Sequence, residues 1–185
     1  MAARFDRIGP DHRRFIERQH VFFVASAAKD AKINLSPKGL DALRVLDETA
    51  VVYLDRTGSG NETAAHLKAD GRLTFMFCAF EGPPLILRLY GRGCVLPRGG
   101  RDYAQLLDEQ FGGQEPIGAR QMVRLDVEML QTSCGYGVPT YLYAGERPSL
   151  DNWAQAADRD LAAYRAEKNL VSLDGLPTGL VEAED

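Results

Sequence analysis

The chain has 185 residues, of which 45% are hydrophobic and 26% are charged, so it can bury the core of one well-packed domain. Its formal net charge of −4 argues against general nucleic-acid binding, which requires a basic face. No apolar run approaches the length of a membrane span, and residues 1–15 lack the apolar core of a secretory signal. We therefore expect neither a nucleic acid nor a membrane among its partners.

The cysteines and histidines indicate a reduced protein without a metal site. Cys78, Cys94 and Cys134 are odd in number, lie far apart and form no C-x-x-C pair, which is typical of a cytoplasmic protein. The histidines show no ligand spacing with one another or with the cysteines, so we expect no bound metal. His66 falls inside a predicted helix, and we interpret it as a surface or interface residue rather than a catalyst. The sequence pattern assigns no catalytic residue.

Two strands near the amino terminus are predicted to form a hairpin. The first elements are a helix over residues 10–18, a buried strand over residues 20–27 and a second strand over residues 33–38. In the second strand Ile33 and Leu35 share one side, whereas Asn34, Ser36 and Lys38 form a polar row on the other. Such a row could line a cleft and bind a polar heterocycle or a phosphate, and it could equally be an ordinary solvated face.

After a short amphipathic helix predicted over residues 40–46, residues 50–54 read as a strand that leads directly into a second helix. Ser59 and Glu62 fit a capping box at the start of that helix, and Gly71 is well placed to end it. A helix N-terminus directly after a strand presents free N–H groups to an anion, and Arg56 adds a positive charge. This stretch predicts a phosphate pocket.

A structural reading of the same stretch competes with the phosphate pocket. Capping boxes begin many helices that bind nothing, and Glu62 brings a negative charge to the same place. The glycines match neither common nucleotide fingerprint, because no Lys-Ser/Thr pair follows them and no third glycine completes a G-x-G-x-x-G. Both readings stay open on these residues alone.

The rest of the chain predicts further strands and helices. The strands cover residues 73–80, 85–96, 120–131 and a short piece at 141–143, and the helices cover residues 102–111 and 150–168. Gly91 and Gly93 suggest a bulge or a sharp bend inside the longest apolar strand. With no βαβ alternation, about six or seven mostly antiparallel strands favour a small closed or split barrel over a Rossmann sheet. We predict one domain over residues 1–185, mainly β with short helices (α+β), with a leading helix and a carboxyl-terminal helix and turn-rich, acidic tail over about 149–185.

Three segments together resemble the pyridoxamine 5′-phosphate oxidase-like family of FMN-binding, antiparallel split β-barrels. They are the hairpin FFVASAAKDAKINLSPKG, the strand–loop–helix VVYLDRTGSGNETAAHLKADGRLTFMF and the strand LILRLYGRG, and the resemblance covers about Phe15 to Met129. It implies an FMN whose ring lies along the second strand and whose phosphate sits at the loop and helix start. It also implies a homodimer with the cofactor at the subunit interface, to which residues 133–139 or Trp153 of the partner copy would contribute.

Carried over position by position, the resemblance assigns cofactor-binding roles to residues of these segments. The ring and phosphate contacts would come from Asn34, Ser36 and Lys38, the backbone contacts from Tyr53, Leu54 and Asp55, the phosphate or ribityl contacts from Arg56, Ser59, Asn61 and Thr63, and a contact near the far edge of the flavin from Arg88.

The chain departs from true oxidases of pyridoxamine phosphate at two places. Those enzymes pair an arginine and a lysine where this chain has Gly60 and Asn61, and they carry a histidine-containing segment near the carboxyl terminus that is missing from residues 144–185. The resemblance therefore implies an FMN-dependent oxidoreductase with a substrate other than a vitamin B6 compound, with NADH or NADPH as a candidate electron donor. The alternatives are a non-catalytic flavin- or haem-binding module and a deazaflavin-dependent reductase on the same fold.

Overall fold

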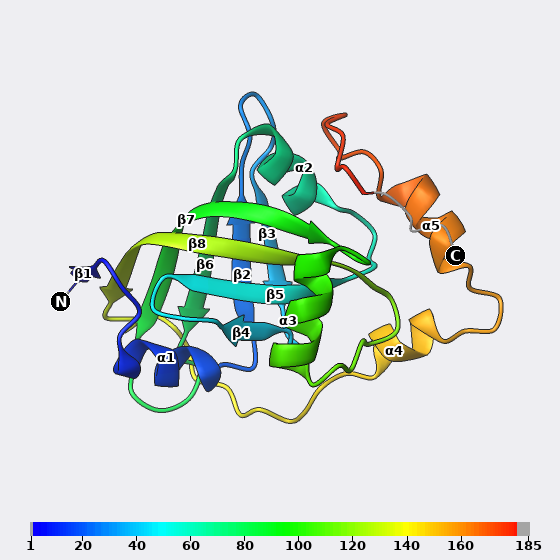
Figure 1. Ribbon diagram of the computed structural model, residues 1–185. Helices are drawn as coiled ribbons and strands as arrows, with labels where there is room; N and C mark the ends of the chain where they lie inside the picture. The colour runs from blue at the N-terminus through cyan, green and yellow to red at the C-terminus, as the bar shows by residue number, and fades with distance from the viewer. Residues whose placement is uncertain (1, 181–185) are drawn as a thin grey trace.

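In the computed structural model, which describes residues 2–180, one antiparallel sheet curls into a split barrel with short helices around it (Figure 1). The strands are β1 (Ala3–Phe5), β2 (Phe22–Ser26), β3 (Asn34–Lys38), β4 (Leu43–Val45), β5 (Ala50–Arg56), β6 (Arg72–Cys78), β7 (Ile86–Pro97) and β8 (Ala119–Ser133). The helices are α1 (Pro10–Glu17), α2 (Glu62–Ala69), α3 (Arg101–Phe111), α4 (Ser149–Ala154) and α5 (Leu161–Lys168). The strand order is β3-β2-β6-β7-β8-β5-β4, and β1 adds to β8, so the predicted split-barrel fold is confirmed.

Alternation along the strands builds the barrel core. In β2, for example, Phe22, Val24 and Ser26 are buried, whereas the residues between them are half-buried. The ring of Phe22 lies 5.6–5.8 Å from the rings of Tyr53, Phe75 and Phe77, at the centre of the core. The predicted hairpin is confirmed, because β2 pairs with β3 from Phe22 opposite Lys38 to Ser26 opposite Asn34.

Two helices cover parts of the sheet that the core leaves open. Helix α3 crosses β5 and β8 on their outer side, where Tyr103 packs with Val52, Leu54 and Met122 (Figure 1). Helix α2 lies at one end of the barrel, where Leu67 joins the main core. No helix in residues 2–180 combines the length and the apolar character that crossing a bilayer demands.

The predicted bend in the long strand is confirmed. The register of β7 against β8 shifts between Tyr90 and Gly91, which is a β-bulge. A Cβ at Gly91 would overlap the backbone carbonyl oxygen of Asp126, and a Cβ at Gly93 would lie 2.5 Å from a methyl carbon of Leu73. Glycine is required at position 91 because the backbone of β8 approaches too closely for any side chain, whereas at position 93 the side chains of Leu73 and Leu67 occupy the space.

The helix predicted over residues 40–46 is wrong. Leu43 to Val45 form strand β4, which pairs with β5, and Leu40 and Asp41 before it adopt left-handed backbone angles of 60° and 51° in φ. A leucine every third residue fits a helix, but pairing with β5 satisfies the backbone and buries Val45 in the main core.

The carboxyl-terminal helix and the last strand also differ from the prediction. Residues 150–168 form two short helices, α4 and α5, and Asp160 caps the second by accepting a hydrogen bond from the amide of Ala163. Residues 141–143 are extended but belong to no strand, whereas the unpredicted β1 pairs with the end of β8. The acidic end of the tail, residues 181–185, lies outside the described residues.

Candidate functional site

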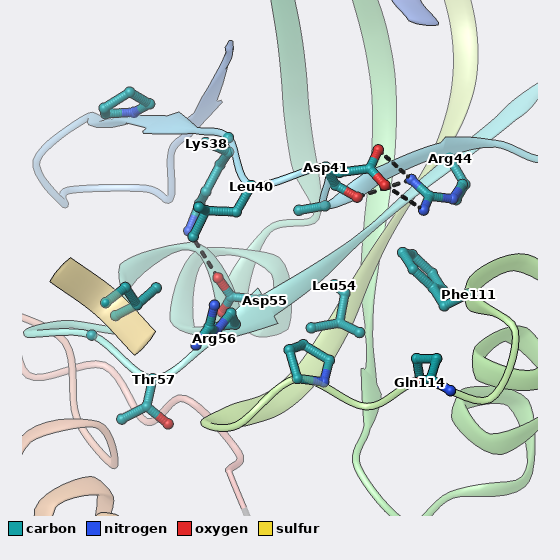
Figure 2. Close-up of a pocket in the computed structure, with 16 residues that line it drawn as sticks. Lys38, Leu40, Asp41, Arg44, Leu54, Asp55, Arg56, Thr57, Phe111 and Gln114 are labelled. Atoms are coloured by element: carbon teal, nitrogen blue, oxygen red, sulfur yellow. Dashed lines mark hydrogen bonds and ion pairs between the residues drawn. The ribbon is translucent and has the colours of Figure 1, made fainter. Parts of the chain in front are cut away.

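The two segments that the sequence connects with one ligand meet at the split of the barrel. Strand β3 is an edge of the sheet, and Lys38 at its end reaches across the opening to Asp55 on β5, with Nζ 2.8 Å from Oδ1 (Figure 2). A pocket of about 490 Å³ opens at this place. Its walls include Pro37, Lys38, Leu40, Ala42, Arg44, Leu54, Asp55, Arg56, Thr57, Gly58, Phe111 and Leu150. We call this pocket the split pocket.

Asp55 is the centre of a buried charged network at the base of the split pocket. Its carboxylate accepts hydrogen bonds from Lys38, from Arg120 Nε at 2.8 Å and from Gln121 Nε2 at 3.0 Å. Burial by itself raises the pKa of Asp55, but the guanidinium of Arg120 and then the ammonium of Lys38 hold that pKa well below its usual range. Asp55 therefore stays ionised near neutral pH and organises cations instead of exchanging a proton.

The polar row of the hairpin faces inward, so the interpretation as an ordinary solvated face is wrong. The amide of Asn34 donates to Thr63 Oγ1 on α2 at 3.1 Å, and the hydroxyl of Ser36 donates to Asn34 Oδ1 at 3.2 Å. Leu35, on the other side of β3, is 62% exposed. The hairpin is thus connected to the start of α2 through polar side chains, and its apolar residues face outward.

The predicted capping box is wrong, because α2 begins at Glu62, two residues later than a cap at Ser59 requires. The N-cap is Asn61 without a side-chain cap, Ser59 is exposed, and the carboxylate of Glu62 accepts hydrogen bonds from the amide of Leu173 instead. Gly71 ends the helix as predicted, with φ of 88° and its amide donating to the carbonyl of His66.

In the loop before α2, residues 58–61, backbone carbonyls accept hydrogen bonds from other segments, whereas the backbone amides have no partner among the described residues. The carbonyl of Gly58 accepts from Asn169 Nδ2 at 3.0 Å and the carbonyl of Gly60 accepts from Arg120 at 2.9 Å, while Asn61 Oδ1 accepts from Gln121. The backbone amides of residues 58–61 donate to no other described residue. Free amides beside a helix start can bind an anion.

Each arginine or lysine in the wall of the split pocket already has a carboxylate partner within the chain. Lys38 pairs with Asp55, Arg56 Nη2 lies 2.6 Å from Asp151 Oδ1 on α4, and Arg44 pairs with Asp41. The charge at the pocket is therefore balanced, and an incoming anion would share these cations with carboxylates instead of meeting bare charges.

Some of the predicted residues lie outside the pocket wall. Tyr53 belongs to the main core, and its buried hydroxyl has no hydrogen-bond partner among the described residues. Arg88 follows Leu87, which is fully buried in the barrel interior, so its side chain projects from the opposite face of the sheet and donates to Ser133 at 3.4 Å. Within one copy of the chain, Arg88 does not reach the split pocket.

His66 is not a surface residue, contrary to our interpretation. It is fully buried, and its Nδ1 lies 3.0 Å from the hydroxyl oxygen of Ser26, whereas Nε2 has no partner among the described residues. Ser26 is itself buried, so this pair is not placed to act on a substrate. Within residues 2–180, no group of histidine, cysteine, aspartate and glutamate side chains could hold a metal ion.

The sequence pattern did not reveal Arg120, Gln121 and Asn169, which hold the site together. Asn169 is fully buried after α5, and its Oδ1 accepts from Arg120 at 2.8 Å. Arg120 and Gln121 precede the alternating part of β8, and this break in the pattern was the available signal. Asn169 gave no signal, because the partners of its side chain, Arg120 and Gly58, lie 49 and 111 residues away along the chain.

Comparison with known proteins identifies the family. A family model described as pyridoxamine 5′-phosphate oxidase matches residues 8–134. The pyridoxamine 5′-phosphate oxidase family protein ustO of Aspergillus flavus is 36% identical over 194 residues, which cover 96% of this chain and 78% of that protein. The chain belongs to the pyridoxamine 5′-phosphate oxidase family.

Solved structures agree with this family at the level of the fold. HupZ of Group A Streptococcus is 19% identical with a TM-score of 0.53, over 66% of this chain and 91% of that one. A candidate pyridoxamine 5′-phosphate oxidase from Lactobacillus delbrueckii is 14% identical with a TM-score of 0.54, over 68% of this chain and 94% of that one. At such identities the likeness shows a shared split barrel and does not transfer a ligand or a reaction.

Proposed function

We propose that this member of the pyridoxamine 5′-phosphate oxidase family binds FMN at the split pocket and acts as an FMN-dependent oxidoreductase. The observation that carries the proposal is the meeting of the polar hairpin and the strand–loop–helix segment at one hollow, through Lys38 and Asp55. At about 490 Å³ the hollow falls within the range of roughly 300–1,000 Å³ that is usual for small-molecule sites.

The residues around the split pocket suit the phosphate of a flavin mononucleotide. Lys38 and Arg56 provide positive charge, and the amides of residues 58–61 provide free donors beside them. When bound, FMN would supply hydride transfer at its N5 atom, so the chain needs to bind and orient more than to exchange protons. Asp55, held ionised, would fix Lys38 at the pocket wall.

Three alternatives are a haem site, a deazaflavin reductase and a flavin-binding module without activity, and haem fits this pocket least well. Haem needs an axial ligand such as histidine, cysteine, methionine or tyrosine, and none of these lines the split pocket. A deazaflavin reductase or a flavin-binding module without activity would use the same walls. We favour the flavin enzyme, with NADH or NADPH as electron donor and a substrate other than a vitamin B6 phosphate, because Gly60 and Asn61 provide no charged pair at the loop.

We also propose that the active form is a homodimer with the cofactor at the subunit interface. Ile33, directly before β3, and Leu35, on the outer side of β3, are 79% and 62% exposed, which leaves two neighbouring large apolar side chains in water. A second copy would cover them and would bring Arg88, which lies on the outer face of the sheet, into an interface.

Spectroscopy of the purified protein tests the cofactor. The protein should be yellow, and NADH or NADPH should bleach it under nitrogen. Yellow colour without bleaching would support the binding module, and a colourless protein that takes up deazaflavin would support the reductase.

Mutation of two cations tests the location of the phosphate. Lys38→Ala with Arg56→Ala should weaken FMN binding by at least tenfold, because hydrogen bonds to charged groups contribute about 1.5–3 kcal/mol each. The matched control is Arg7→Ala with Arg72→Ala, which removes the same charge from exposed ion pairs elsewhere on the surface. Unchanged FMN affinity in the first double variant would remove both residues from the site.

A further inference from the structure

A second and larger hollow lies beside His20 and Val21, directly before β2. It has a volume of about 700 Å³ and is formed between the turn at residues 79–85 and the extended segment that passes it at residues 141–144. Its walls are mainly apolar and aromatic, and include Phe15, Val21, Phe80, Leu85, Tyr141 and Tyr143. We call it the aromatic hollow.

Specific contacts hold the two sides of the aromatic hollow in place. The amide of Tyr141 donates to the carbonyl of Phe80 at 2.9 Å, and the amide of Tyr143 donates to the carboxylate of Glu81 at 3.0 Å. The hydroxyl of Tyr143 donates to Glu146 at 3.0 Å, and the ring of Tyr143 stacks on His20 with centroids 3.6 Å apart and planes 5° apart. The hollow is therefore formed before any ligand arrives.

The aromatic hollow and the split pocket are neighbours on the surface of the molecule. A third hollow of about 440 Å³ lies between them and shares His20, Val21 and Tyr143 with the aromatic hollow. The same third hollow shares Gly39, Leu40 and Leu150 with the split pocket. A molecule in the aromatic hollow would thus face the proposed cofactor site past the stacked rings of His20 and Tyr143.

The chemistry of the walls defines the ligand. Flat aromatic side chains on both sides suit a flat aromatic molecule, since such rings pack face to face or edge to face. The one acidic side chain in the wall, Glu81, already accepts the amide of Tyr143. Arg18 at the rim makes no side-chain hydrogen bond or ion pair with any residue in 2–180. The free guanidinium suits an anionic group on the ligand.

We propose that the aromatic hollow binds a flat, apolar aromatic molecule with an anionic substituent, and that this molecule is the substrate. Only the second part, the assignment as substrate, depends on the proposed flavin function.

Two fluorescent probes test the binding site without FMN: 8-anilinonaphthalene-1-sulfonate, which is aromatic and anionic, and N-phenyl-1-naphthylamine, which has the same rings without charge. Wild-type protein should bind both. Phe80→Ala and Tyr143→Ala should each weaken both by about fivefold, as expected for lost aromatic packing. Tyr143→Phe keeps the ring and should bind like wild type, which separates loss of the site from loss of folding.

The matched control is Tyr136→Ala, which removes an 82% exposed ring that lines none of the hollows described above. It should leave both affinities unchanged. Equal losses of probe affinity in Tyr136→Ala and Tyr143→Ala would overturn the proposal. A wild-type protein that binds neither probe, because a second copy covers the hollow, would overturn it as well.

Arg18→Gln tests the anionic group. It should weaken the sulfonate probe by about threefold to tenfold and leave the neutral probe unchanged. Arg14→Gln, one turn earlier on helix α1 and paired with Asp11, should change neither. An equal effect of Arg18→Gln on both probes would refute the role of charge. If FMN fails to bind while both probes bind as described, the site stands and its assignment as the substrate site falls.

Discussion

Asp55 shows how one buried carboxylate organises a binding site. Its side chain is 3% exposed, and three donors from different segments converge on it. A buried carboxylate is stabilised only where its partners compensate for lost hydration, and the two cations provide that compensation. Because Arg120 also bonds to Gly60 and Asn169, the charge of Asp55 is connected to the loop that would receive a phosphate.

Asp55→Asn should lower the free energy of unfolding at pH 7 by about 3–5 kcal/mol, because Lys38 and Arg120 would lose their buried counter-charge. The pKa of Asp55 is lower in the folded chain than the value of about 3.9 expected when unfolded, so ionised Asp55 stabilises the fold at higher pH. This contribution is complete above about pH 5 and is lost as the pH falls through the lowered pKa of the folded state. Urea unfolding between pH 7 and pH 2 measures it.

The difference between wild type and Asp55→Asn should therefore shrink as the solution is acidified. Asp126→Asn is the matched control, since Asp126 is 61% exposed and pairs with Arg124 on the surface, where an ion pair contributes roughly 0–1 kcal/mol. A constant difference between wild type and Asp55→Asn over this pH range would contradict the linkage.

At the level of elements, the sequence predicted those strands and bends that depend on residues close together along the chain. Alternation located the hairpin and β8, and the glycines located the bulge in β7. Residues 40–46 were misassigned because pairing with β5 outweighed a helix-like spacing of leucines. The capping box failed because α2 begins at Glu62, which makes Glu62 its first residue instead of its third, and the carboxylate of Glu62 accepts from the distant Leu173.

The sequence predicted the two segments that form the candidate site, but it did not predict the residues that connect them. The polar row of β3 and the loop before α2 were visible as patterns, and the structure brings Lys38 to Asp55 and Asn34 to Thr63. Arg120 contacts Asp55 and Asn169 contacts Gly58 only because the fold brings distant parts of the chain together. No local periodicity of the sequence could therefore assign Arg120 and Asn169 to the site.

Gly91→Ala should destabilise the sheet by about 1–3 kcal/mol or more, as overpacking does, because the added methyl group would overlap the carbonyl of Asp126 at the bulge. The midpoint of urea unfolding measures the loss. The control is Gly137→Ala, where nothing lies within 4 Å of the added carbon. Equal midpoints for Gly91→Ala and wild type would mean that the bulge can move to admit a side chain.

At the scale of the whole molecule, the carboxyl-terminal segment folds back across the proposed cofactor loop. An extended stretch leads from β8 to α4 and α5 beside the barrel (Figure 1). The amide of Asn169 then bonds to the carbonyl of Gly58, and Lys32 in the hairpin turn pairs with Asp174. The 76% exposed Leu173 precedes Asp174, and its amide donates to the carboxylate of Glu62 on α2.

Leu35→Glu should convert the proposed homodimer into a monomer, because a charge on this apolar surface would lose hydration against a second copy. Sedimentation equilibrium should give the mass of two chains for wild type and of one chain for the variant. If the cofactor lies at the interface, the variant should also bind FMN more weakly, and the thermal midpoint of wild type alone should rise with protein concentration. Ala104→Glu adds the same charge on the exposed side of α3 and should stay a dimer. A wild-type protein that sediments as a single chain would exclude a site shared between subunits and would leave the split pocket to bind FMN within one copy.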